Sequence, residues 1–168
     1  MLTATTELAI RALILLGLSG EGKPIPPRRL AATLACSPTY LSKTLGNLVR
    51  SGILRSVRGA RGGVVIARDP AQITVLEIVE DCQGAVLGDY CQGIRADEVA
   101  MSCRYHRVMA ELHGQIVRTL SGCTLAELLA CPAPVLHGRR SQSLGCKMDF
   151  AGIGALVESR NRVRRDEP

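Results

Sequence analysis

Two cysteines, an aspartate and a histidine lie close together near the middle of the chain, in the stretch CQGIRADEVAMSCRYH. Asp97 is midway between Cys91 and Cys103, with five residues on either side. His106 follows Cys103 by three positions, so on a helix the two side chains project from one face. Thiolates, imidazoles and carboxylates are the ligands that proteins offer to iron, zinc and iron–sulfur clusters. The spacing therefore predicts a loop that folds around a metal ion or a cluster.

The cysteine count and the hydropathy pattern favour a reducing compartment. The chain of 168 residues contains seven cysteines, an odd number, and shows neither a signal peptide nor an apolar run long enough to span a bilayer. We therefore expect a cytoplasmic protein with no membrane partner, in which thiols stay reduced. In that setting the cysteines fit metal or redox chemistry better than a disulfide framework.

The net charge of +6 is distributed unevenly along the chain. Residues 1–70 carry 10 basic and 3 acidic side chains, residues 71–137 carry 4 and 8, and residues 138–168 carry 7 and 4. A basic first part followed by an acidic middle part favours a module that binds a polyanion such as DNA. A generic basic surface gives the same count, so charge alone leaves both interpretations open.

The first third of the chain has the pattern of a helix-turn-helix. Three helices are predicted there: 3–18, 27–35 and 38–49. Glycines at positions 17, 20 and 22 are expected to end the first helix, and Ser37 followed by a proline is suited to begin the third. Leucines recur along the third helix at intervals of four and three and must face a core. Short polar side chains and a lysine remain to contact base edges or phosphates in the major groove: Ser37, Thr39, Tyr40 and Lys43.

A β-hairpin is predicted directly after these helices. Two runs rich in β-branched residues, 53–57 and 64–67, are separated by RGARGG. Glycines allow a backbone to approach a surface closely, and Arg58 and Arg61 fit phosphates or a narrow minor groove. A hairpin in this position is a wing, and the alternative is that both arginines are ordinary solvated loop residues.

The remainder of the chain predicts a long helix between two short ones. Capping boxes, Thr74 with Glu77 and Thr124 with Glu127, open helices that end near residues 82 and 130. Cys82 is predicted to be a small buried apolar side chain rather than a ligand. A long helix is expected from residue 102 or 103 to about 120, and its narrow apolar stripe is typical of a dimer interface. The stripe comprises Tyr105, Met109, Leu112, Ile116 and Leu120. Residues 132–168 are rich in Gly, Ser and Arg, and we expect a basic, disordered tail.

The stretch SPTYLSKTLGNLVRSGILRSVRGARGGVVIARDPAQITVLEIVE closely resembles the winged-helix module of the Rrf-type bacterial regulators, and TELAIRAL in the first helix matches as well. This resemblance covers about residues 2 to 130. It implies a homodimeric transcription factor with a long, crossed dimerisation helix. Many members of the family hold an iron–sulfur cluster through three cysteines in the loop before that helix.

The resemblance also implies a set of ligands. Cys91 and Cys103 match the first and third cysteines of the family, while Asp97 stands at the position of the second. The fourth ligand of IscR-like members is a histidine that corresponds to His106. In NsrR-like members it is a carboxylate from the first helix of the partner subunit, at the position of Glu7. Two thiolates with a nitrogen and an oxygen ligand suit a 2Fe-2S cluster better than a four-iron cluster.

Three alternatives stay open at this stage. The segment could bind zinc, or it could bind no metal and act through thiol oxidation or through a metabolite that binds elsewhere. An enzyme with a Cys103–His106 pair is the third possibility. It is disfavoured because no oxyanion hole or substrate cleft is predicted, and because the basic winged helix would have no role.

The sequence thus predicts a mainly α-helical fold with a small β-hairpin, that is, a winged helix-turn-helix followed by a long dimerisation helix. Residues 1–70 would bind DNA, residues 71–131 would sense and dimerise, and residues 132–168 would form the tail. The predicted function is that of a homodimeric regulator on a double-stranded operator. It would act as a repressor or as an activator, and it would sense redox state, nitric oxide or iron status through a cluster in the segment 91–106.

Overall fold

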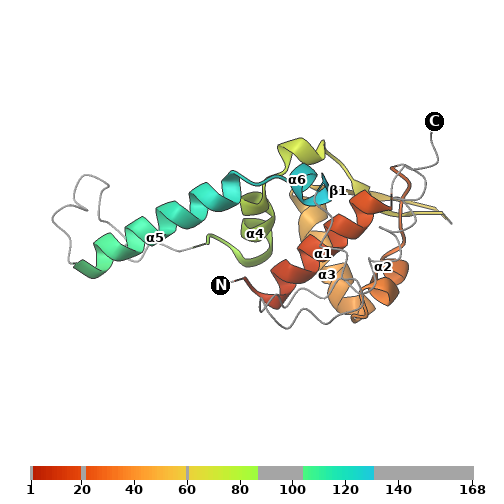
Figure 1. Cartoon of the computed structure of the whole chain (residues 1–168). Helices are drawn as coiled ribbons and strands as arrows, with labels where there is room; N and C mark the ends of the chain where they lie inside the picture. Colours follow the sequence, from red (N-terminus) through yellow and green to blue (C-terminus); the bar gives the residue numbers. More distant parts are fainter. Residues whose placement is uncertain (1, 20–21, 60, 87–103, 131–168) are drawn as a thin grey trace, which may run out of the picture.

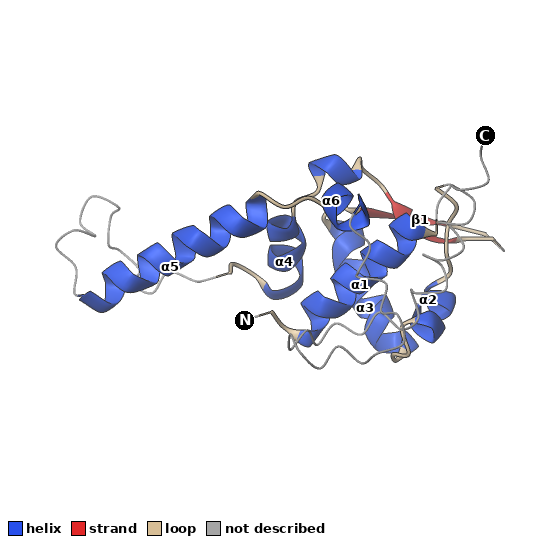
Figure 2. Ribbon diagram, in the orientation of Figure 1, coloured by secondary structure: helices blue, strands red, loops and turns tan. Residues whose placement is uncertain are grey.

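The computed structural model describes residues 2–19, 22–59, 61–86 and 104–130 (Figure 1). Its elements follow one another as α1 (Ala4–Leu18), α2 (Pro27–Thr33), α3 (Pro38–Arg50), β1 (Leu54–Val57), β2 (Gly63–Ile66), the 3-10 turn η1 (Pro70–Gln72), α4 (Val75–Gln83), α5 (Arg104–Ser121) and α6 (Leu125–Ala130). The described residues are mostly helical, with one small antiparallel hairpin (Figure 2). This confirms the predicted fold class.

A core of aliphatic side chains surrounds α1. Ten of the 15 residues of this helix are buried. The helices α3, α4 and α6 and the strand β2 pack around it, and α2 packs on α3. The three leucines of α3 that the periodicity turned inward, Leu41, Leu45 and Leu48, are each at most 2% exposed. Burying such a side chain contributes about 1.5–3 kcal/mol, so the core orients α3 with one face inward and the other outward.

α1 ends at Leu18 as predicted, and Gly17 lies within its last turn. A Cβ atom at this position would lie 2.5 Å from Leu129 Cδ1 of α6. The missing side chain therefore allows α6 to pack directly on α1. Two backbone hydrogen bonds, from Val75 N to Cys123 O and from Leu125 N to Ile73 O, both 2.8 Å, also tie α6 to the start of α4.

The helix-turn-helix forms as predicted, with a shorter second helix. α2 ends at Thr33 rather than at residue 35, because Ala35 takes a left-handed conformation with φ 51° that turns the chain toward α3. The Ser37 side chain accepts a hydrogen bond from the backbone N–H of Tyr40 at 3.5 Å and so caps α3, with Pro38 in its first turn.

The hairpin is positioned by a short backbone contact with the segment before α2. β1 and β2 pair antiparallel, with Leu54 opposite Ile66 and Val57 opposite Gly63. Ile25 exchanges two backbone hydrogen bonds of 3.0 Å with Val64. A Cβ atom at Gly63 would lie 2.4 Å from the carbonyl of Ile25, so glycine is required there. The wing is thus fixed to the helix-turn-helix on its second strand.

The two predicted capping boxes differ in the structure. In α6 both bonds form, because Thr124 N donates to Glu127 Oε2 at 2.7 Å and Glu127 N donates to Thr124 Oγ1 at 3.3 Å. In α4 only the bond from Glu77 N to Thr74 Oγ1, at 3.2 Å, is present. The Glu77 carboxylate instead binds Arg68, at the end of the wing.

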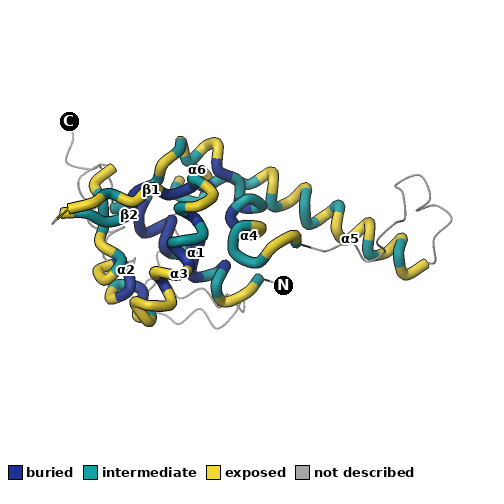
Figure 3. The backbone as a smooth tube through the Cα atoms, turned by 180° about the vertical axis from the view of Figure 1, so that it is seen from behind, coloured by how far each residue is buried: buried dark blue, intermediate teal, exposed yellow. Residues whose placement is uncertain are grey.

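α5 extends away from the packed helices as a long arm (Figure 1). None of its 18 residues is buried, whereas α1 is mostly dark blue in Figure 3. Tyr105, Val108 and Leu112 are 58%, 52% and 45% exposed. The predicted helix is therefore present. Tyr105 and Leu112 of the predicted stripe form an exposed apolar stripe together with Val108, whereas Met109 and Ile116 are half-buried and Leu120 packs against the core. Its expected start at residue 102 or 103 and the expected tail at 132–168 lie outside the described residues.

Candidate nucleic-acid interface and sensor segment

The outward face of α3 carries the predicted DNA-contacting side chains. Ser37, Thr39 and Lys43 are exposed, on the first turns of the helix or at its cap. The N-terminal end of a helix also carries a partial positive charge that favours a phosphate. This face can therefore offer hydroxyls, an ammonium group and backbone N–H groups to a DNA groove.

Tyr40 belongs to the same face but has a partner within the chain. It is 41% exposed, and its hydroxyl is hydrogen-bonded to the hydroxyl of Thr5 on α1. No pattern in the sequence indicated this contact, because the two residues are 35 positions apart. Tyr40 thus projects from α3 in an orientation that α1 fixes.

The tip of the wing exposes both predicted arginines, Arg58 and Arg61. Gly59 has a φ of 113°, a backbone conformation that side chains strongly disfavour. A Cβ atom at Gly62 would lie only 2.3 Å from the carbonyl oxygen of Val57. The glycines are therefore needed to close a tight loop, and that loop projects two guanidinium groups into solvent.

Further exposed arginines lie on the elements that make up this region, and motif analysis had not singled them out. They are Arg28 and Arg29 on α2, Arg50 at the end of α3 and Arg55 on β1. Arg50 donates to the side-chain oxygen of Asn47. In the sequence, only the excess of basic residues in positions 1–70 indicated that these four arginines contribute to a basic surface. Their positive charge strengthens the attraction of the first part of the chain for a polyanion.

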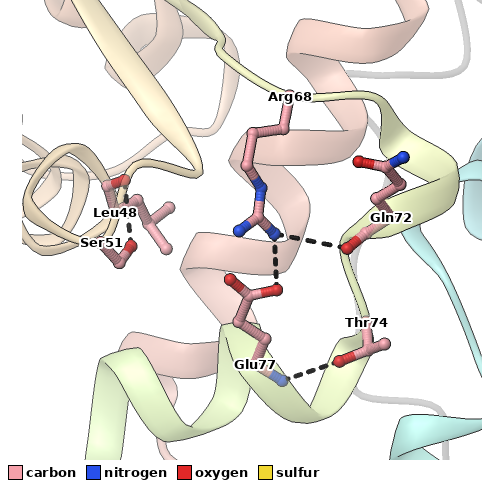
Figure 4. Close-up of polar contacts among 6 residues, drawn as sticks. All are labelled: Leu48, Ser51, Arg68, Gln72, Thr74 and Glu77. Atoms are coloured by element: carbon pink, nitrogen blue, oxygen red, sulfur yellow. Dashed lines mark hydrogen bonds and ion pairs between the residues drawn. The ribbon is translucent and has the colours of Figure 1, made fainter.

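An ion pair fastens the end of the wing to α4 (Figure 4). Arg68 Nη2 lies 2.6 Å from Glu77 Oε2 and donates a second, longer bond of 3.4 Å to the carbonyl oxygen of Gln72. The hydrogen bond to Glu77 raises the pKa of the Arg68 guanidinium, so this side chain keeps its positive charge. Side-chain exposures of 37% and 32% make this a surface contact, which holds geometry more than it adds stability.

The predicted metal ligands are only partly within the described residues. Glu7 lies half-buried in the first turn of α1, and His106 lies half-buried in the first turn of α5. The His106 ring meets that of Tyr105 edge to face, with centroids 5.8 Å apart. Cys91, Asp97 and Cys103 lie outside the described residues. Among the residues the structure does describe, no three His, Cys, Asp or Glu side chains form a group that could hold a metal ion.

Three cysteines of the described part are free thiols that pack partly against the core: Cys36, Cys82 and Cys123. Burial raises the pKa of each of them, and for Cys82 burial together with the charge of Asp81 raises the pKa to about 11. The thiols are therefore protonated at neutral pH and are poor nucleophiles. Cys82 packs beside the core as predicted, although it is half-buried rather than fully buried.

Gln83, the last residue of α4, binds the first turn of α1. Its Oε1 accepts hydrogen bonds from the backbone N–H of Thr3 at 3.0 Å and from the hydroxyl of Thr6 at 2.9 Å. Sequence reasoning missed this contact, which joins residues about 80 positions apart. It brings the end of α4 to the turn that carries Glu7.

Within the described ranges, the structure contains no helix with the length and hydropathy needed to cross a membrane.

Comparison with known proteins gives one consistent family. Residues 2–131 match the family Rrf2, described as iron-dependent transcriptional regulator. An HTH-type transcriptional regulator, ORF2, from Azotobacter vinelandii is 30% identical over 154 residues, which cover 90% of this chain and 94% of that protein. The HTH-type transcriptional regulator IscR of Cronobacter sakazakii is 28% identical over 128 residues, covering 76% and 79% of the two chains.

Solved structures with the same architecture include two regulators. CymR, the global cysteine regulator of B. subtilis, superimposes with a TM-score of 0.66 at 19% identity, over 79% of this chain and 98% of that one. IscR of T. potens gives a TM-score of 0.64 at 24% identity, over 83% and 93%. These similarities, together with the winged helix-turn-helix and its exposed basic face, lead to one assignment. The chain belongs to the Rrf2 family and is a DNA-binding transcriptional regulator rather than an enzyme.

Proposed function

We propose that the protein regulates transcription as a homodimer that joins along α5. The observation that carries this proposal is the exposed apolar stripe of α5, where Tyr105, Val108 and Leu112 are about half exposed on an arm that no described element covers along its length. A stripe of this kind is stable in water when a second copy covers it. In this proposal residues 1–70 bind DNA and residues 71–131 carry the sensor and the dimer interface.

The dimer would place one α3 in each of two successive major grooves of a near-palindromic operator. Ser37, Thr39, Tyr40 and Lys43 would contact base edges and phosphates there. The wing would reach the adjacent minor groove through Arg58 and Arg61. The exposure of these side chains and the compact glycine turn at the wing tip support this arrangement.

The segment 91–106 would hold an iron–sulfur cluster, most simply of the 2Fe-2S type. Cys91 and Cys103 would supply thiolates, and Asp97, His106 and Glu7 are the candidates for the remaining positions. This donor set fits a cluster in chemistry, since two thiolates are joined by a nitrogen and by oxygen ligands. In the described residues, Glu7 and His106 are both only half-buried, so each side chain reaches the surface. A bound cluster supplies redox and iron responsiveness, and the protein residues set its stability.

Asp97 is the reason for a second candidate function. With a carboxylate in place of the middle cysteine, the same DNA-binding dimer would respond to zinc, to thiol oxidation or to a metabolite, without a cluster. The two candidates differ in one property that is simple to measure, which is the content of iron and acid-labile sulfide.

The deciding experiment starts with anaerobic purification of the full chain. We expect brown protein with visible absorbance bands and with iron and sulfide in equal amounts. Colourless protein that lacks both after reconstitution would exclude the cluster. An operator is then selected from a pool of randomised DNA duplexes with the wild-type protein. Its affinity is measured with and without the cluster, and a cluster-dependent difference is expected.

Changing Cys103 to alanine tests the ligand set directly. We expect this variant to lose the visible absorbance and to retain the helical circular dichroism of the wild-type protein, because a single thiolate is removed from a cluster that needs it. Cys123→Ala is the matched control, since Cys123 is a thiol that contacts the core rather than a proposed ligand. Cluster absorbance that survives in Cys103→Ala would mean that the ligand set is incorrect.

A further inference from the structure

A chain of hydrogen bonds connects the last residue of α4 to the first turn of α3 by way of α1. It begins at Gln83, whose Oε1 lies 3.0 Å from the backbone N of Thr3 and 2.9 Å from Thr6 Oγ1. A backbone N–H can only donate, so the atom that it meets must be the carbonyl oxygen of the glutamine amide. Thr6 is 0% exposed, so water cannot take the place of this acceptor.

The donors and acceptors in this group form one consistent set. The Thr6 hydroxyl proton goes to Gln83, so in the 3.0 Å contact between the two threonine hydroxyls the donor is Thr3. Thr3 Oγ1 in turn accepts the backbone N–H of Thr6 at 3.2 Å, which is the capping bond of α1. Gln83 Oε1 therefore accepts the hydrogen bonds of both Thr3 N and Thr6 Oγ1 and donates none itself. It fixes both the cap and the first turn of α1.

The same turn of α1 also holds α3. Thr5 precedes Thr6, and its hydroxyl is hydrogen-bonded to the hydroxyl of Tyr40. Tyr40 lies in the first turn of α3, on the face that carries the proposed DNA contacts, and 41% of its surface is exposed. A shift of the first turn of α1 would therefore change the orientation of the Tyr40 side chain. The buried leucines of α3 would still hold the helix as a whole.

We propose that Gln83 is a positioning residue for DNA recognition. Through Thr3 and Thr6, and then through Thr5, it sets the orientation in which Tyr40 meets the operator. The inference rests on the proposed DNA interface only for its last step, the contact of Tyr40 with DNA.

Gln83→Met tests the proposal, because methionine has nearly the length of glutamine and lacks the acceptor oxygen. We expect operator affinity to fall about three- to tenfold, since a released Tyr40 must be ordered again on binding. Gln83→Glu retains an acceptor and is expected to remain within about twofold of wild type on the same scale. Gln72→Met, the same change at an exposed glutamine, controls for the substitution itself.

A double-mutant cycle with Tyr40→Phe separates the relay from a general structural effect. If Gln83 acts through the Tyr40 hydroxyl, Gln83→Met should have no further effect on operator affinity once that hydroxyl is absent. Equal losses of affinity with and without the Tyr40→Phe change would overturn the proposal. Thr5→Val removes the middle of the relay without touching the buried hydroxyl, and it takes the place of Gln83→Met in the cycle should that variant unfold.

Fluorine NMR gives a measurement that is independent of DNA binding. The chain contains three tyrosines, Tyr40, Tyr90 and Tyr105, so 3-fluorotyrosine labelling yields three signals that single Tyr→Phe variants assign. Gln83→Met should shift the Tyr40 signal, and Gln83→Glu should leave it in place. An unchanged Tyr40 signal would overturn the relay. A shifted signal with unchanged operator affinity would show that the relay exists but that Tyr40 does not contact DNA. That result would overturn the positioning role of Gln83 and is distinct from a failure of the relay.

Discussion

The packed helices around α1 and the arm α5 differ in how far their apolar side chains are buried. We call the first of them, the described residues of α1 to α4 together with the wing and α6, the DNA-binding unit. It buries 23 apolar side chains in one cluster, including one from α6 after the arm. The arm has 18 residues, none of them buried. Contacts within the chain thus bury the apolar side chains of the DNA-binding unit, whereas they leave the apolar stripe of the arm exposed.

This difference has a physical meaning for regulation. The base of the arm is held firmly, because α6 follows it and is tied by backbone hydrogen bonds to the start of α4. If a second copy packed on the stripe, the two arms would therefore join two rigid DNA-binding units, one from each copy. Their separation would be set by the arms, whereas the shape of each DNA-contacting face would be set by its own core.

The largest effect is expected in the core of the DNA-binding unit. Leu45→Ala removes a side chain of α3 that is 2% exposed, and we expect the free energy of unfolding to fall by about 2–5 kcal/mol. Urea denaturation followed by circular dichroism measures this change. Val108→Ala is the matched truncation on the arm, where the side chain is 52% exposed, and the change there should be about 0.5 kcal/mol or less in the monomer. Equal changes at both sites would contradict the comparison.

A charge on the stripe tests whether a second copy covers the arm. Leu112→Asp should convert the dimer to a monomer in light scattering and lower operator affinity about 100-fold or more, because two linked binding units become independent. Ala110→Asp places the same charge on an exposed residue about a third of a helical turn away from the stripe, and it should leave the mass unchanged. A dimer that persists in Leu112→Asp would rule out the stripe as the interface.

The wing tip should show an intermediate effect. Arg61→Ala is expected to lower operator affinity about 10- to 30-fold and to reduce the slope of affinity against salt, since each arginine lost removes a phosphate or minor-groove contact. Fluorescence anisotropy across a salt series measures both quantities. Arg107→Ala removes the same charge from an exposed site on the arm and should change the affinity little. Similar salt slopes for Arg61→Ala and wild type would argue against the wing as a DNA contact.

Local signals in the sequence were sufficient for most of the fold. Capping residues and the spacing of leucines predicted the helices, because caps and helical faces involve residues that are only three or four positions apart. The same logic failed at Glu77, where a partner nine residues earlier, Arg68, takes the carboxylate that a capping box would use. It also missed the packing role of Gly17, which depends on Leu129 from the other end of the described chain.

The candidate site could be predicted only in part, for the same reason. Ser37, Lys43 and the wing arginines follow from local patterns, and their exposure agrees with a surface role. The contacts of Gln83 with Thr6 and of Tyr40 with Thr5 join residues 77 and 35 positions apart, which no periodicity encodes. Spacing alone pointed to the cysteines, the aspartate and the histidine of the segment 91–106, whereas Glu7 was added only by the resemblance to a family. The test of this ligand set is the iron and sulfide content.

The smallest expected effect concerns the ion pair between the wing and α4. Glu77→Gln keeps the shape of the side chain and its hydrogen-bonding capacity but removes its charge. Both partners are about one-third exposed, so we expect the free energy of unfolding to fall by less than about 1 kcal/mol, with a smaller difference from wild type at high salt. The measurement is urea denaturation at low and high salt.

The operator affinity of Glu77→Gln tests whether the DNA-binding unit and the arm depend on each other. The pair fixes the end of the wing to α4, so Glu77→Gln should weaken the DNA contact of the wing slightly while the dimer stays intact. Glu80→Gln, which neutralises an exposed carboxylate on the same helix, serves as its control. A change in mass for Glu77→Gln would show that α4 controls the arm. A change in affinity alone would show that the DNA-binding unit and the arm are independent at this contact.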